Sequence, residues 1–190
     1  MAKRLSKDAR REQLLESAMA IVAEQGADAL TLATVAERAG VTKPVAYEHF
    51  GTRAGLLLAL YRRIDARQAD AFRSALARTP RRIGEVARVM GDAYMSCYST
   101  IGPEWHAITA ALKGDPAMEA VQQELLDGYV DLYHQALRPF SKLPPDELQL
   151  RCVGIVGAGE AISRDLTRGR VDADRAAQSL AAVIQRAIKD

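Results

Sequence analysis

Cysteine, histidine and aromatic residues are scarce in this chain of 190 residues, which has two cysteines, three histidines and 5% Phe, Trp and Tyr. Cys97 and Cys152 lie far apart in apolar helical stretches, a placement more typical of core packing than of a disulfide or a redox pair. The histidines show no metal-ligand spacing, and no nucleophile motif or catalytic triad accompanies them. We therefore expect no metal, no cofactor and no catalytic residue.

The chain also lacks a long apolar run and a strong net charge. No segment approaches the roughly 20 apolar residues needed to cross a bilayer, so we expect a cytoplasmic protein with no membrane partner. The hydrophobic content of 48% and the charged content of 26% are typical of a soluble globular protein. The net charge is only +2, but residues 1–63 hold 10 Lys and Arg against 7 Asp and Glu, whereas the remainder holds 16 against 17.

Residues 31–50, TLATVAERAGVTKPVAYEHF, predict two short helices joined by a tight turn. Thr31 and Thr42 are suited to cap the two helices through their hydroxyl groups. Ala36 lets a second helix cross closely, and Gly40 supplies the left-handed backbone between them. This is the pattern of a helix-turn-helix, whose second helix enters the major groove of DNA. An ordinary helical hairpin without a ligand has the same local pattern.

The first eleven residues form a basic segment. Its five cations face a single acid, Asp8, and they are Lys3, Arg4, Lys7, Arg10 and Arg11. Such a segment can neutralise DNA phosphates, and we predict contacts for Lys3 and Arg4 in particular. A solvated tail is the alternative.

Helical periodicity continues along the rest of the chain, so the predicted fold class is all-α. The predicted helices span about 6–25, 52–76, 80–101, 103–113, 116–138, 144–166 and 172–188. The helix from Pro144 is apolar or small on nearly every side and must be covered on more than one face. With the helix that Asp172 caps, it predicts a four-helix interface in a homodimer.

Residues 1–63 resemble the TetR family of one-component bacterial transcriptional regulators. The resemblance rests on LLESAMAIVAEQG, Thr31, VAERAGVTKPVAYEHF and GTRAGLLLAL, which occur at the family's own spacings. It implies an N-terminal three-helix helix-turn-helix domain joined by a linking helix to a helical ligand-binding and dimerisation domain. We accordingly expect a DNA-binding domain at 1–63, including the start of the linking helix, and a ligand-binding and dimerisation domain at 64–190.

The resemblance also implies DNA contacts for individual residues. Positions that commonly touch the DNA backbone are matched by Thr31, Tyr47 and Arg53. Positions at or near the groove are matched by Thr42, Lys43, Val45 and His49. Val45 departs from the small or flexible residues that are frequent there, and it favours contact with a thymine methyl group over a hydrogen bond.

Most aromatic residues beyond the helix-turn-helix cluster in the middle of the chain, namely Tyr94, Tyr98, Trp105, Tyr129 and Tyr133. Aromatic side chains combine apolar area with a polar tip, which suits a pocket for a small organic ligand. Because the family carries a pocket in this region, these residues are predicted to bind the effector together with Met90, Cys97, His106 and Ile108. An aromatic-rich core is the alternative.

These observations predict a one-component transcriptional regulator, most often a repressor, that binds a palindromic double-stranded operator as a homodimer. A small organic effector is expected to release it. The alternatives are an all-helical small-molecule-binding enzyme that uses a residue such as His106 with Glu104, and an adaptor that binds only protein. The operator, the target genes, the effector and the direction of regulation stay open.

Overall fold

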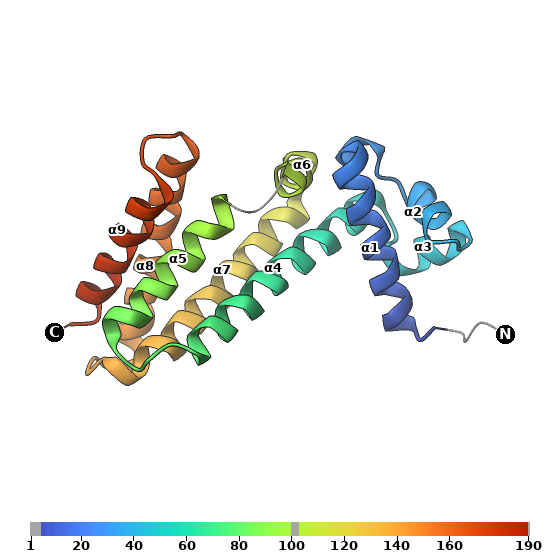
Figure 1. Ribbon diagram of the computed structural model, residues 1–190. Helices are drawn as coiled ribbons and strands as arrows, with labels where there is room; N and C mark the ends of the chain where they lie inside the picture. Colours follow the sequence, from blue (N-terminus) through green and yellow to red (C-terminus); the bar gives the residue numbers. More distant parts are fainter. Residues whose placement is uncertain (1–4, 100–102, 190) are drawn as a thin grey trace. The chain divides into compact units, whose positions relative to one another are not determined.

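The structure is a computed structural model that describes residues 5–99 and 103–189, apart from the side chains of residues 97–99 and 103–106. Within these ranges the chain forms nine α-helices and two short 3-10 helices, with no strand (Figure 1). The predicted all-α class is therefore confirmed. Among the described helices, none combines the length and the apolar composition that crossing a membrane requires.

Two compact units divide the chain. Unit 1 comprises Met1–Asp65 and Gly102–Val121, and unit 2 comprises Ala66–Ile101 and Gln122–Asp190. This division differs from the linear one predicted at residue 63, because residues 102–121 group with the N-terminal residues.

Unit 1 is built from α1 (Lys7–Gln25), η1 (Ala27–Ala29), α2 (Leu32–Arg38), α3 (Lys43–Phe50), α6 (Pro103–Ala111) and the adjoining parts of α4 (Arg53–Ala77) and α7 (Pro116–Leu137). The helix α6 belongs here because it packs against α1 and η1. Ser6 caps α1 by accepting a hydrogen bond from the amide of Ala9 at 3.2 Å, and Gly26 ends it with φ 81°. The predicted apolar stripe of α1 is confirmed, since its members are all buried: Leu14, Leu15, Ala18, Ile21 and Val22.

The predicted helix-turn-helix is formed by α2 and α3. Thr31 caps α2 reciprocally with Thr34: its hydroxyl accepts from the Thr34 amide at 3.0 Å, and the Thr34 hydroxyl accepts from the Thr31 amide at 2.9 Å. Gly40 takes φ 66° in the turn between the helices.

Thr42 holds the N-cap position of α3, but its hydroxyl makes no capping bond with a described residue, so that part of the prediction is wrong. An N-cap hydroxyl accepts from the backbone amide two or three residues further on. Two residues after Thr42 stands Pro44, which has no N–H. The next amide, that of Val45, donates to the backbone carbonyl of Thr42 at 3.0 Å.

Unit 2 contains α5 (Ile83–Ser99), η2 (Arg138–Phe140), α8 (Pro145–Thr167), α9 (Ala173–Ala187) and the remaining parts of α4 and α7. Pro80 does not begin α5 as predicted. Residues 80–82 form a turn in which the Arg82 amide donates to the Pro80 carbonyl at 2.7 Å, and the helix begins at Ile83. Asp172 caps α9 as predicted, because its carboxylate accepts from the Arg175 amide at 2.8 Å.

The interior of unit 2 includes Cys152, which is fully buried, as predicted. Burial raises the pKa of its thiol to about 11, so the group stays neutral and packs as an apolar side chain. The side chain of Cys97 lies outside the described residues.

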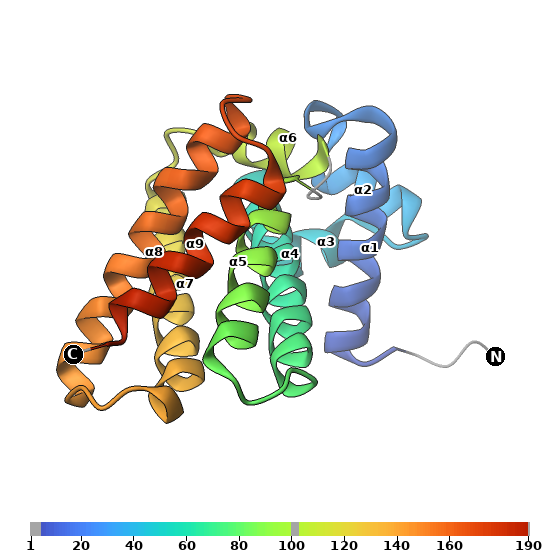
Figure 2. The same cartoon turned by 60° about the vertical axis from the view of Figure 1, so that its left-hand side comes forward.

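Glycines set the distance between α5, α8 and α9, which pack against one another (Figure 2). A Cβ atom added at Gly91 on α5 would lie 2.4 Å from the carbonyl oxygen of Ala177 on α9. A Cβ atom added at Gly159 on α8 would lie 2.8 Å from the ring of Tyr94 on α5. Both contacts are closer than real Cβ atoms permit. At Gly91 the neighbour is backbone, so α5 approaches α9 this closely because residue 91 lacks a side chain; at Gly159 the neighbour is the ring of Tyr94, which lies over the glycine.

The close approach at Gly91 predicts opposite effects for two glycine substitutions. Gly91→Ala should lower the free energy of unfolding by about 1–3 kcal/mol, because the new methyl group meets backbone that cannot rotate away. Gly128→Ala on α7 is the control: no described heavy atom lies within 4 Å of its added Cβ, and alanine should stabilise the helix by about 0.5–1 kcal/mol. Urea denaturation measures both, and equal stabilities would contradict the prediction.

Candidate nucleic-acid interface

The helix α3 has one anchored face and one free face. Ala46 is fully buried and Phe50 is 9% exposed. Lys43 and Glu48 are exposed, and Tyr47 is 53% exposed, which is unusual for so large an aromatic residue. The helix therefore uses one side for packing and leaves the other available for a partner.

The remaining predicted groove residues lie between these two faces. Val45 and His49 are half-buried, while Thr42 is exposed at the N-cap. The ring of His49 lies 6.1 Å from that of Phe50, centroid to centroid. Because the Thr42 hydroxyl is not used for capping, it is available to an external hydrogen-bond partner.

Neighbouring helices hold α3 in place. The guanidinium of Arg11 on α1 lies 5.3 Å from the centre of the Phe50 ring, a cation–π contact with the last turn of α3. The amide of Val41 donates to the Ala36 carbonyl at 2.9 Å, and the side chain of Gln13 donates to the Ala39 carbonyl at 3.3 Å. The turn before α3 is thus tied to both α1 and α2.

Arg53, a predicted DNA contact, is engaged within the protein. Its Nε donates to the Leu30 carbonyl at 2.8 Å and its Nη2 donates to the Ala27 carbonyl at 2.6 Å. The carboxylate of Asp28 lies 4.0 Å away. The guanidinium at the start of α4 therefore clamps the segment between η1 and α2, a structural role that the sequence analysis missed.

Two ion pairs brace α1 against the other helices of unit 1. Arg38 on α2 donates to both carboxylate oxygens of Glu24, at 2.6 and 2.5 Å. These hydrogen bonds hold the pKa of the Glu24 carboxyl below its usual value, so their stabilising effect is lost as the pH falls through that lowered pKa. Arg63 on α4 is only 9% exposed in its side chain and pairs with Glu12, with Glu16 3.5 Å away.

The basic segment is helical from Lys7 onward, because α1 begins there. Lys3 and Arg4, the two predicted contacts within it, lie outside the described residues. Exposed acids, Glu37 and Glu48, lie on α2 and α3. The charge of the exposed face is therefore mixed rather than uniformly positive.

The predicted effector-binding residues are distributed over both units. Met90 and Tyr133 are buried in the core of unit 2, where the Tyr133 ring lies 5.7 Å from that of Phe72. Tyr129 is half-buried against the same core, whereas Ile108 is buried within unit 1. Four of the predicted side chains lie outside the described part of the chain, namely Cys97, Tyr98, Trp105 and His106.

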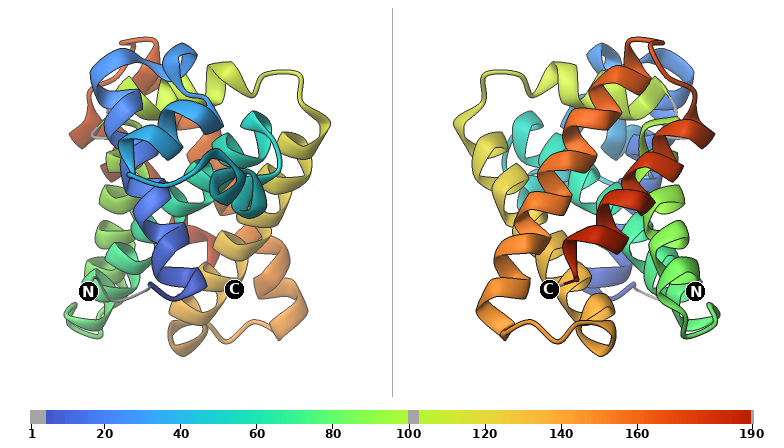
Figure 3. Two further views of the ribbon diagram at one scale, coloured as in Figure 1. Left: turned by 90° about the vertical axis from the view of Figure 1, so that its right-hand side faces the viewer. Right: turned by 90° about the vertical axis from the view of Figure 1, so that its left-hand side faces the viewer.

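A second free surface lies on α8 and α9, which run side by side (Figure 3, right). Leu150 is 66% exposed, Val153 51% and Val183 38%. Added Cβ atoms at Gly154 and Gly157 would meet no described atom within 4 Å. Exposed apolar side chains beside bare glycine backbone make this face suitable for close packing against another helix.

Comparison with known proteins finds relatives of this chain, and the first match includes α2 and α3. A sequence profile of "Bacterial regulatory proteins, tetR family" matches residues 14–60. The transcriptional activator FasR of Mycolicibacterium smegmatis is 40% identical over 76 residues, which is 40% of this chain but only 35% of that protein. The transcriptional regulator BetI of Yersinia pestis (strain Pestoides F) is 30% identical over 154 residues, which covers 78% of this chain and 76% of BetI.

Solved structures share the whole fold at low identity. A TetR-family regulator from Rhodococcus sp. is 23% identical, with a TM-score of 0.64, and the match covers 97% of this chain and 100% of that one. FadR of Bacillus subtilis, solved with stearoyl-CoA, is 15% identical with a TM-score of 0.65 and coverages of 91% and 96%. Together with the extended match to BetI, these similarities show that the chain belongs to the TetR family of bacterial transcriptional regulators.

Proposed function

We propose that this chain is a dimeric repressor that binds a palindromic DNA operator through α3 and is released by a small organic effector. The observation that carries the proposal is the free face of α3, on which Lys43 and Tyr47 are exposed while Ala46 and Phe50 anchor the opposite side. Activation is the alternative direction, because the FasR relative is named as an activator. Family membership favours regulation over the enzyme and adaptor alternatives.

Two groups of residues are proposed to contact DNA. The proposed base-reading residues are Thr42, Lys43, Val45 and His49. The proposed phosphate ligands are Lys3, Arg4, Thr31 and Tyr47. In the first group, Thr42, Lys43 and Val45 lie at the N-terminal end of α3, from which a recognition helix reaches base edges, and His49 lies in its last turn. Phosphate contacts fix the register of the protein on the duplex. Arg53 is proposed to contribute mainly by fixing the backbone that precedes α2, and thereby the position of the helix-turn-helix.

Dimerisation is proposed to occur through the exposed faces of α8 and α9. Leu150 and Val153 on α8 and Val183 on α9 supply apolar area that a second copy would bury in a four-helix interface. A two-fold axis would present two copies of α3 to successive major grooves, about 34–36 Å apart.

An effector is proposed to bind in the C-terminal domain predicted at residues 64–190. Structural neighbours solved with bound molecules include FadR with stearoyl-CoA, SmeT with triclosan and EbrR with imidazole. The described candidates are Met90, Tyr94, Tyr129 and Tyr133 in unit 2 and Ile108 in unit 1, and the other predicted residues stay predictions. Since α4 and α7 contribute residues to both units, they provide a covalent path for coupling, and DNA must weaken effector binding by the same factor.

Selection from a random DNA pool tests the proposed function. The 190-residue chain should enrich an inverted repeat, and its affinity for that repeat should fall steeply as salt rises. The affinity for the selected duplex is compared with that for a duplex of scrambled sequence across a salt series. Equal affinities at every salt concentration would argue against a sequence-specific regulator, provided that they stay equal after the protein has been unfolded and refolded to remove a bound effector.

Substitutions on α3 should separate base reading from phosphate binding. Tyr47→Phe should weaken binding to all duplexes by about 1 kcal/mol, roughly fivefold, because one hydrogen bond to phosphate is lost. Lys43→Ala should weaken binding to the selected duplex by about 1–3 kcal/mol and relax base preference at one position. Lys142→Ala, the same change at an exposed residue after η2, is the control. If Lys43→Ala changed neither the DNA affinity nor the base preference, Lys43 would not be a base-reading residue.

Replacing Arg53 should affect stability as well as DNA affinity. Arg53→Lys keeps the charge but cannot donate to two separate carbonyl groups in the same fork geometry. We expect the free energy of unfolding to fall by about 1–2 kcal/mol, and DNA affinity to fall for every sequence. Thermal denaturation and fluorescence anisotropy measure the two effects. Full stability with normal DNA affinity would show that the clamp is dispensable.

A charge on the outer face of α8 should dissociate the proposed dimer. Leu150→Glu buries an unpaired carboxylate in the proposed interface, and the dimer dissociation constant should rise by about a hundredfold. Gln135→Glu adds the same charge at an exposed position on α7 and is the control. Sedimentation equilibrium measures both, and a Leu150→Glu protein that remains dimeric would place the interface elsewhere.

A further inference from the structure

The C-terminal end of α9 is held by residues that come from outside that helix. The last carbonyl groups of a helix have no partner within it. Here the Nη1 of Arg151 on α8 donates to the carbonyls of both Ala187 and Lys189, at 2.8 and 2.7 Å. The hydroxyl of Ser141 donates to the carbonyl of Ile188, between them, at 3.2 Å. Three consecutive carbonyl groups are thus bound from α8 and from the segment that precedes it.

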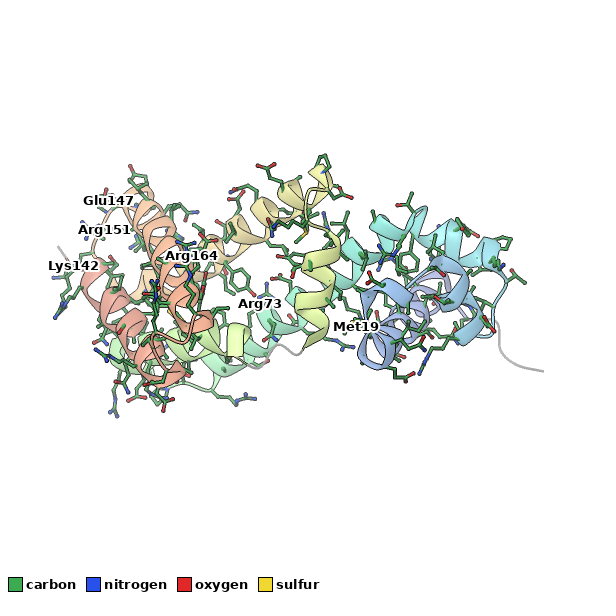
Figure 4. The ribbon with its side chains drawn as sticks, turned by 90° about the horizontal axis from the view of Figure 1, so that it is seen from above. Met19, Arg73, Lys142, Glu147, Arg151 and Arg164 are labelled. Atoms are coloured by element: carbon green, nitrogen blue, oxygen red, sulfur yellow. The ribbon has the colours of Figure 1, made fainter. Side chains whose placement is uncertain are left out.

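The guanidinium of Arg151 is itself held in a fixed orientation. Its Nε donates at 2.8 Å to the carboxylate of Glu147, one turn earlier on α8. Glu147 and Arg151 lie at the same end of α8, and Arg164 lies further along it (Figure 4). A planar group that donates in two directions can connect an acid on its own helix with the end of another helix, which a flexible ammonium group cannot do equally well. The positive charge also suits the negative end of the α9 dipole.

This clamp involves the same turns of α8 and α9 as the exposed apolar residues. Leu150 and Val153, which are 66% and 51% exposed, flank Arg151 in the sequence of α8. Val183, 38% exposed, is one turn before Ala187 on α9. In an α-helix the carbonyl of residue 183 accepts from the amide of residue 187, so fraying of the last turn would release Val183.

We propose that Arg151 is a positioning residue for the dimer interface: by fixing the last turn of α9 on α8, it holds Leu150, Val153 and Val183 in one surface. The inference rests on the proposed dimerisation through α8 and α9. Arg151 makes its bonds within one subunit, and its contribution to dimerisation is to keep the two helices in the geometry that a second copy binds.

The test compares Arg151→Met with Arg88→Met in the full-length chain. Methionine keeps much of the apolar stem but removes the donors. Arg88 on α5 is the matched control, because its ion pairs, with Glu85 and Asp92, stay within its own helix. Arg151→Met should raise the dimer dissociation constant about tenfold or more by sedimentation equilibrium, whereas Arg88→Met should change it less than twofold. Hydrogen exchange should accelerate at the amides of the last turn of α9 in Arg151→Met alone.

The conservative variant and the interface variant separate the possible outcomes. Arg151→Lys should give an intermediate dissociation constant, since one ammonium group replaces only part of the clamp. A purely local role would lower the melting temperature of Arg151→Met but leave its dissociation constant unchanged; if Leu150→Glu dissociates under the same conditions, that result overturns the inference while the proposed interface stands. If Leu150→Glu remains dimeric, the proposed interface itself fails, and the inference fails with it.

A milder variant covers the case in which Arg151→Met does not fold. Glu147→Gln leaves the guanidinium in place but weakens the hydrogen bond that orients it. We expect a rise of about threefold in the dissociation constant together with faster exchange at the end of α9. An unchanged constant in Glu147→Gln would then count against the positioning role.

Discussion

The close packing of α2 against α3 is the constraint on which the candidate DNA-binding surface depends. The two helices contact each other, Ala36 on α2 and Ala46 on α3 are exposed only 1% and 0%, and Gly40 supplies the left-handed turn with φ 66°. Larger side chains at either alanine would push α3 outward and change which of its residues face away from the core. Lys43 and Tyr47 thus face outward because the small side chains of Ala36 and Ala46 let α3 pack closely on its other side.

Two arginines of unit 1 hold parts of its fold together. Arg53 and Arg63 both lie on α4, yet one binds backbone carbonyls near the start of α2 and the other pairs with carboxylates on α1. Each of these arginines is therefore committed within the protein. Lys43 is the exposed lysine on α3, and the acids Glu37 and Glu48 are exposed on α2 and α3, so the candidate DNA-binding surface carries no large excess of positive charge.

Unit 2 combines tight internal contacts with an uncovered outer face. Gly91 lets α5 approach the backbone of α9 so closely that no Cβ fits, and Gly159 on α8 lies under the ring of Tyr94. On the far side of α8, Gly154 and Gly157 have open space instead. The same residue type therefore serves two purposes on one helix: a glycine facing inward closes the core, whereas glycines facing outward leave backbone that another helix can approach.

Local patterns were enough to predict the helices, the caps at Thr31 and Asp172, and the buried stripe of α1, because periodicity and capping act over a few residues. The family resemblance supplied the candidate DNA contacts. Three features could not be predicted from the local sequence: the hydrogen bonds of Arg53, the packing of α6 against α1, and the contact of the Tyr94 ring with Gly159. Each joins groups that are 23 or more residues apart, and such contacts are decided by packing in three dimensions, on which the local sequence pattern carries no information.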